Sequence, residues 1–100
     1  MLDISTSFDG DGATVALGGR LDTNSAPELE EALGGVFAKT HRVTLDLSDL
    51  MYISSAGLRV FVWAFKAVSS TEGSFVVENP RPEVREVFEM TGLVDVFEVR

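Results

Sequence analysis

The sequence predicts one α/β domain, a mixed β-sheet with helices packed on it, in the order ββαβαβα. Apolar and polar residues alternate from Leu2 to Phe8, which is the period of a half-buried strand. Apolar residues at 29, 33, 36 and 37 repeat at helical spacing. Short apolar runs at 43–47 and 75–77 follow helical segments, as in parallel crossovers. The chain has 100 residues, so we expect a single domain over residues 1–100.

The first half of the chain should begin with a hairpin. Strand 2–8 turns at 9–12, a run of Asp and Gly, into a second strand over 13–17 that Gly18-Gly19 should end. After a connector, Ser25 and Glu28 have the spacing of a capping box, in which Ser is the N-cap and Glu reaches back to it. We expect this helix to end near Lys39.

The second half centres on an apolar strand and an apolar helix. The strand is expected over 43–47, followed by a polar loop over 48–53 and a helix whose apolar part is 58–68. In that helix Leu58, Phe61, Val62 and Phe65 share one stripe, and Trp63 is predicted to lie in the core.

The C-terminal third continues the alternation of strand and helix. A turn over 69–73 leads to the strand 75–77. Pro82 should open a third helix with Val84, Val87 and Phe88 facing inward and Gly92 just past its end. Residues 93–100 fit a short turn or a last strand.

Composition excludes several classes of function. The net charge of −8 argues against binding to nucleic acid or to an anionic membrane surface, because both need clustered Lys and Arg. The chain has no cysteine and no apolar run near the ~18 residues of a membrane span. Its N-terminus lacks the regions of a signal peptide, so a cytoplasmic protein is expected.

No catalytic or cofactor motif stands out. His41, the single histidine, begins a strand beside Arg42 and has no nucleophile-elbow pattern near it. The sequence contains no P-loop, and its carboxylates lack the spacing of a metal loop. We therefore predict that the protein is not an enzyme and needs no cofactor or metal.

Two adjacent serines, Ser54 and Ser55, stand where the apolar helix should start, followed by the small residues Ala56 and Gly57. A helix start has backbone N–H groups without intrahelical partners and a partial positive charge. A serine there can be an ordinary N-cap, or an accessible hydroxyl whose phosphate would be well held. The two roles are compatible.

The run from Tyr52 to Val60, YISSAGLRV, closely resembles the signature of STAS domains, in particular the bacterial anti-sigma factor antagonists. The segments 19–22, 43–48 and 87–93 resemble the same family in the same order. The resemblance covers almost the whole chain, and the length matches a stand-alone member.

This resemblance implies a switch. The unmodified antagonist would bind a partner that is both an anti-sigma factor and a serine kinase; ATP-dependent phosphorylation would release that partner, and a serine phosphatase would reset the protein. The acceptor would be Ser55, two residues before Gly57, with Ser54 as second choice because it replaces the aspartate of better-known members. The alternative is a constitutive STAS scaffold in a signalling or transport system that phosphorylation does not switch.

The predicted switch face comprises Ser55 and the residues around it: Asp22, Met51, Tyr52, Ser54, Ala56, Gly57 and Arg59. Asp22 matches a family acidic residue near the acceptor, but it also fits a turn residue that satisfies nearby backbone. Met51 and Tyr52 fit partner contacts or a cover over the edge of the core. Arg59 fits a solvated side chain or a contact to partner or phosphate. No feature of the sequence sets an oligomeric state.

Overall fold

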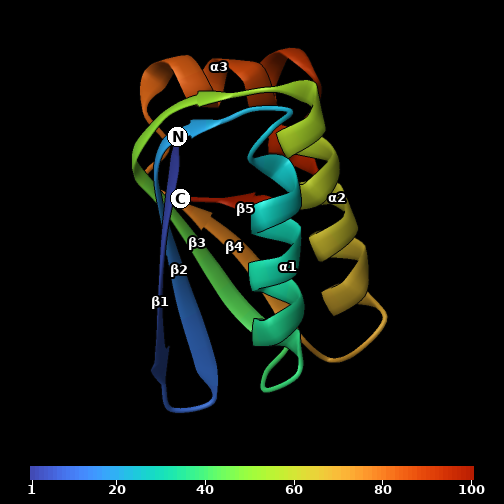
Figure 1. The fold of residues 1–100 in the computed structure, drawn as a ribbon. Coiled ribbons are helices and arrows are strands. Elements are labelled where there is room, and N and C mark those ends of the chain that lie inside the picture. Colours follow the sequence, from blue (N-terminus) through green and yellow to red (C-terminus); the bar gives the residue numbers. More distant parts are fainter.

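The computed structural model describes all 100 residues and places the helices against a five-stranded sheet (Figure 1). The elements are β1 (Leu2–Asp9), β2 (Gly12–Leu21), α1 (Ala26–Phe37), β3 (Arg42–Ile53), α2 (Ser55–Ser69), β4 (Ser74–Glu78), α3 (Pro82–Met90), the 3-10 turn η1 (Leu93–Asp95) and β5 (Glu98–Val99). The predicted order is confirmed, and the C-terminal segment contains both a short turn and a last strand.

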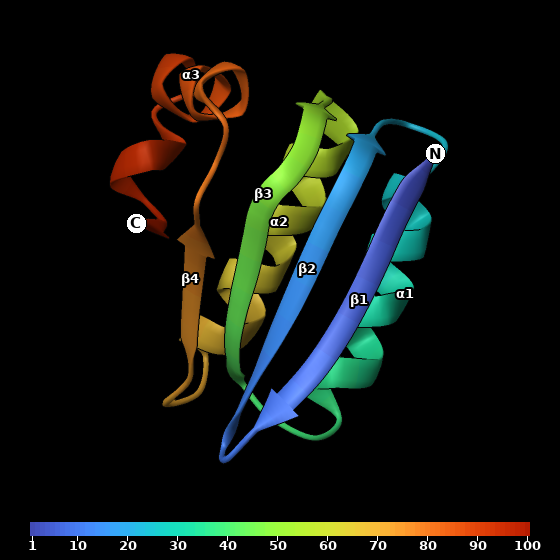
Figure 2. The ribbon, with the colours of Figure 1, turned by 90° about the vertical axis from the view of Figure 1, so that its left-hand side faces the viewer.

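The strands lie in the order β1-β2-β3-β4-β5, and only the β1–β2 pair is antiparallel. Each step from β2 to β4 therefore needs a crossover, and α1 and α2 supply these on the same face of the sheet. Figure 2 shows the other face of the sheet, with both helices behind it and α3 across one end.

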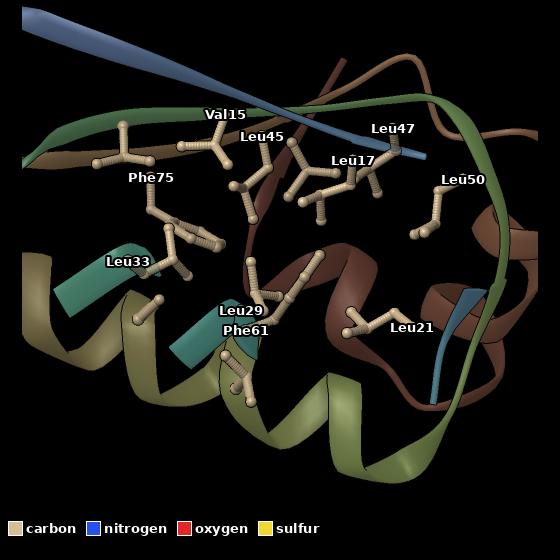
Figure 3. Close-up of a cluster of buried hydrophobic side chains, with 14 of the residues drawn as sticks. Val15, Leu17, Leu21, Leu29, Leu33, Leu45, Leu47, Leu50, Phe61 and Phe75 are labelled. Atoms are coloured by element: carbon tan, nitrogen blue, oxygen red, sulfur yellow. The ribbon is translucent and has the colours of Figure 1, made fainter. Parts of the chain in front are cut away.

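The core lies between the sheet and these two helices. Alternate residues of β2 and β3, such as Val15 and Leu45, point at apolar residues of the helices, such as Leu33 and Phe61 (Figure 3). All four are fully buried, and they belong to one cluster of 23 buried residues. The period of two in the strands and the helical spacing in α1 thus meet at one interface.

Two predicted strand ends are wrong for a common reason. β2 does not end at Gly18-Gly19 but continues to Leu21, and β3 runs through the expected loop to Ile53. The two extensions pair with each other, from Gly18 opposite Asp49 to Leu21 opposite Ile53, with one register shift just before Gly18 and another between Gly19 and Arg20. Gly19 has a φ of 83°, which a glycine adopts at little cost, so the ladder bends and continues.

One helix prediction, that of Trp63, needs correction. α1 ends at Phe37, with Ala38 as its C-cap, close to the predicted end near Lys39. In α2 Phe61 is fully buried, and the rest of the predicted stripe, Leu58, Val62 and Phe65, is half-buried and packs against the core. Trp63 is 39% exposed and does not lie in the core. It projects beside α1, on the side of α2 that the sheet does not cover. α3 follows the prediction, with Val84 and Phe88 buried and Gly92 left-handed just past its end.

Candidate functional site

Ser54 is the N-cap of α2. It is extended, with φ −94° and ψ 172°, and its Oγ accepts the backbone N–H of Gly57 at 3.2 Å. Its own N–H donates to the carbonyl of Leu21 at 2.8 Å, so the end of β3 is attached to the end of β2. The Ser54 side chain is half-buried and its hydroxyl oxygen is engaged.

Ser55 differs from its neighbour. It is the first residue of α2, its side chain is exposed, and its hydroxyl makes no hydrogen bond within the protein. The fold therefore gives one serine the capping role and leaves the other accessible to a second protein.

Gly57 sets how closely α2 approaches the sheet. A Cβ at this position would lie 2.6 Å from Leu21 Cγ and 3.1 Å from Ile53 Cγ1. Gly57 is buried, so of the residues in the predicted switch face it is the one that packs against the sheet and does not reach the surface. The missing side chain allows the first turn of α2 to rest on the paired ends of β2 and β3, which positions Ser55 above them.

Asp22 has the turn role that its sequence context allowed. One carboxylate oxygen accepts the N–H groups of Asn24 and Ser25, both at 3.0 Å, and lies 3.1 Å from the Ser25 hydroxyl. The Ser25 N–H, then the Ser25 hydroxyl, hold the pKa of Asp22 below its ordinary value of 3.8. Because Leu21 pairs with Ile53, Asp22 follows one strand end while Ser54 follows the adjacent one. A carboxylate therefore lies on the same edge of the sheet as the serines.

Ser25 is the N-cap of α1, as predicted, but the capping box does not form. The Ser25 carbonyl accepts the N–H groups of Glu28 and Leu29, whereas its side chain makes no capping hydrogen bond. Its hydroxyl instead accepts the N–H of Asp22 at 2.9 Å and lies 3.0 Å from the carbonyl of Arg20. Ser25 is the one buried polar residue of the chain, and it closes the turn that holds Asp22. The sequence spacing located the N-cap residue but not the partners of its hydroxyl.

Met51, Tyr52 and Arg59 complete the predicted switch face at the surface. Met51 is 52% and Tyr52 40% exposed, so both present part of their side chains to a partner. The Arg20 guanidinium lies over the Tyr52 ring at 4.2 Å, a stacking that sequence reasoning missed because Arg20 was placed in a connector. Arg59 is exposed one turn after Ser55 and makes no ion pair. The predicted residues thus gather at one end of the molecule, where β2 and β3 end and α2 begins (Figure 1).

The described residues contain no trio of His, Asp or Glu side chains positioned to hold a metal ion. No helix combines the length and apolar character needed to cross a bilayer.

Comparison with known proteins gives a consistent family. BtrV of Bordetella bronchiseptica, itself a proposed anti-sigma factor antagonist, is 42% identical over 91 residues, which is 89% of this chain and 78% of that protein. The anti-sigma-B factor antagonist of Bacillus subtilis is 35% identical over 85 residues, 85% of this chain and 78% of that one.

Solved structures agree in fold. An anti-sigma factor antagonist from Mycobacterium paratuberculosis superposes with a TM-score of 0.89 at 26% identity, over 99% of this chain and 85% of that one. Unphosphorylated SpoIIAA gives 0.85 at 17% identity, over 98% and 88%. The family model described as "STAS domain" matches residues 4–100. The chain therefore belongs to the STAS domain family.

Proposed function

We propose that this protein is an anti-sigma factor antagonist switched by phosphorylation of Ser55. With Ser55 unmodified it binds an anti-sigma factor that is also a serine kinase, and with Ser55 phosphorylated it releases that partner. A serine phosphatase resets it, and the cycle runs in the cytoplasm, where the kinase finds ATP. The relatives named as anti-sigma factor antagonists support the partner class. The observation that carries the assignment is the exposed, unbonded hydroxyl of Ser55 at the start of α2.

The position suits a phosphate. A phosphoserine adds about −1.5 to −2 charges and three acceptor oxygens. At the first position of α2 those oxygens are close to free backbone N–H groups and to the positive end of the helix dipole. Arg59 follows at i+4 and has no other charged partner, so it is free to pair with the phosphate. A surface that presented a neutral hydroxyl would then present a dianion, which changes what a partner contacts.

We expect the switch to act locally. Unfolding the start of α2 would expose side chains such as Val60 and Phe61, each worth about 1.5–3 kcal/mol when buried. One phosphate makes only one to three new charge-assisted hydrogen bonds. The fold of this chain matches SpoIIAA in its unphosphorylated form with a TM-score of 0.85 and in its phosphorylated form with 0.78. Both similarities support a switch that retains the fold.

Intact-mass and fragment spectrometry after incubation with the cognate kinase and ATP tests the acceptor. One phosphate should appear on Ser55, and Ser55→Ala should abolish it while Ser54→Ala does not. A phosphate found on Ser54 alone would show that Ser55 is not the acceptor. A protein that binds the kinase but is never modified would be the constitutive scaffold instead.

Calorimetric titration then tests the effect on binding. Ser55→Ala should bind the kinase as the unmodified protein does, because it removes only an unbonded hydroxyl. Ser55→Glu should bind more weakly, because it places a negative charge on the switch face. Equal affinities of the alanine and glutamate variants would contradict an electrostatic switch.

A further inference from the structure

A groove runs between α1 and α2 on the side away from the sheet. Its volume is about 820 Å³, and both helices face it with residues at helical spacing. On α2 these are Ala56, Arg59, Val60 and Trp63; on α1 they include Glu30, Glu31 and Gly34. The two helices lie side by side in Figure 1, so the groove is bounded by helix surfaces along its length.

The groove stays open because its walls lack side chains where they are needed to fill it. Gly34 leaves open space, with no atom within 4 Å of where its Cβ would be. Across from it Trp63 is 39% exposed, although burial of an indole is strongly favourable. An exposed tryptophan at the side of a groove is typical of a surface that a partner covers, since tryptophan is among the residues most enriched in binding hot spots.

The charges along the groove are unpaired. Glu30 and Glu31 on the α1 wall and Arg59 on the α2 wall make no ion pair with each other or with any other residue. α1 has three acidic residues and no basic one, so its wall presents negative charge to an incoming molecule. A partner with basic side chains toward α1 would match this surface.

The groove is continuous with the switch face. Ala56 and Arg59 belong to both, and Ser55 directly precedes them at the start of α2. From Ala56 to Trp63 the α2 wall rises about 10 Å, at 1.5 Å per residue. Both walls are helices whose backbone groups are used internally, so a strand would find no backbone partners here, whereas a helix of about two turns matches the length of the α2 wall.

We propose that this groove receives an amphipathic helix of the anti-sigma factor kinase. The apolar stripe of that helix packs on Trp63 and into the space beside Gly34, and its basic side chains face Glu30 and Glu31. This inference rests on the proposed function and identifies the part of the partner that contacts α1 and α2. Phosphorylation at Ser55 would then act at one end of an interface that extends along both helices.

Two adjacent glycines provide a matched test. Gly34 lines the groove and Gly35 does not, yet both lie in α1 and both have open space at the Cβ position. Gly34→Leu should raise the dissociation constant of the kinase, measured by calorimetric titration, by about tenfold or more. A loss of this size is expected when a side chain blocks the centre of an interface. Gly35→Leu should stay within about twofold of the parent protein. Circular dichroism of both variants should show unchanged helix content.

Charge reversal tests whether the negative charge of the α1 wall contributes to binding. Glu30→Lys should weaken kinase binding several-fold more than Glu28→Lys, which makes the same change of charge in α1 outside the groove. Trp63 is the only tryptophan, so its indole N–H resonance in ¹⁵N-labelled protein reports on the groove alone. That resonance should shift or broaden when unlabelled kinase is added.

The outcomes separate this inference from the proposed function. The groove assignment alone would be overturned if the kinase bound the parent protein and bound Ser55→Glu more weakly, but bound Gly34→Leu and Gly35→Leu with equal affinity. A Trp63 resonance that shifts with the concentration of this protein alone would show a second copy in the groove, and would overturn it too. If no anti-sigma factor kinase binds the parent protein, both inferences fail together.

Discussion

Gly57→Ala should lower the free energy of unfolding, even though alanine is the better helix former. The new Cβ would lie 2.6 Å from Leu21 Cγ and 3.1 Å from Ile53 Cγ1. Both neighbours are buried, at 0% and 4% exposure, so neither can move out into solvent. Overpacking of this kind costs about 1–3 kcal/mol, whereas replacing a helical glycine by alanine gains about 0.5–1 kcal/mol. The middles of these two ranges differ by about 1 kcal/mol, which is the net loss we expect.

Urea denaturation followed by circular dichroism measures this loss. Gly35→Ala is the control, because its Cβ meets no atom within 4 Å and only the helix-propensity gain of about 0.5–1 kcal/mol remains. The expected loss corresponds to a decrease in melting temperature of about 4–8 °C per kcal/mol for a domain of this size. If Gly57→Ala were as stable as the parent while Gly35→Ala gained stability, α2 would not approach β2 and β3 as closely as the structure describes.

Three further predictions address the serines and Asp22. Ser54→Ala should lower the unfolding free energy by about 1 kcal/mol through loss of the N-cap, and Ser55→Ala by less than about 0.5 kcal/mol, in the same denaturation assay; equal losses would contradict the assignment of Ser54 as cap. Because hydrogen bonds lower the pKa of Asp22 in the folded protein, its carboxylate stabilises the fold above the ordinary value of 3.8, and this contribution is lost as the pH falls through the folded-state pKa. The stability difference between the parent and Asp22→Asn should therefore be constant near neutral pH and change only below about pH 4. Amide NMR spectra of the two phosphorylation states should differ around the start of α2 and agree in α3 and the sheet; changes throughout the sheet would mean a global rearrangement.

Periodicity predicted the elements well where burial is one-sided. The alternation of β2 and the stripe of α1 each face a single core, so the pattern in the sequence matches the pattern of burial. In β1 the match holds only for Leu2 and Ile4, because Thr6 and Phe8 lie exposed beyond the helices. The predictions failed where an element continues without that pattern. The local sequence predicted that one strand ends at Gly18-Gly19 and another at Leu47. Both strands continue, because the segment after Gly18 and the segment after Leu47 form hydrogen bonds with each other. Partners far apart in sequence determine such pairing, and local propensity does not report them.

Trp63 shows a second limit of the pattern. α2 is apolar on nearly all sides, so periodicity could not distinguish its buried face from the others. The sheet covers the side that carries Phe61 and Ala64, while the side that carries Trp63 borders the groove beside α1. Only the position of α1 relative to α2 separates a core tryptophan from a groove tryptophan.

In the functional site, too, the sequence predicts the motif but not the role of each residue. The sequence alone shows two serines shortly before a glycine at the start of an apolar helix, and this motif pointed to the family. It could not assign their roles, because adjacent serines have the same side chain and the same local propensities. The tertiary structure decided between them: the pairing of β2 with β3 and the absence of a Cβ at Gly57 set the direction in which the chain enters α2. In that direction the Ser54 hydroxyl turns back to the Gly57 N–H, and the Ser55 hydroxyl is left exposed to solvent.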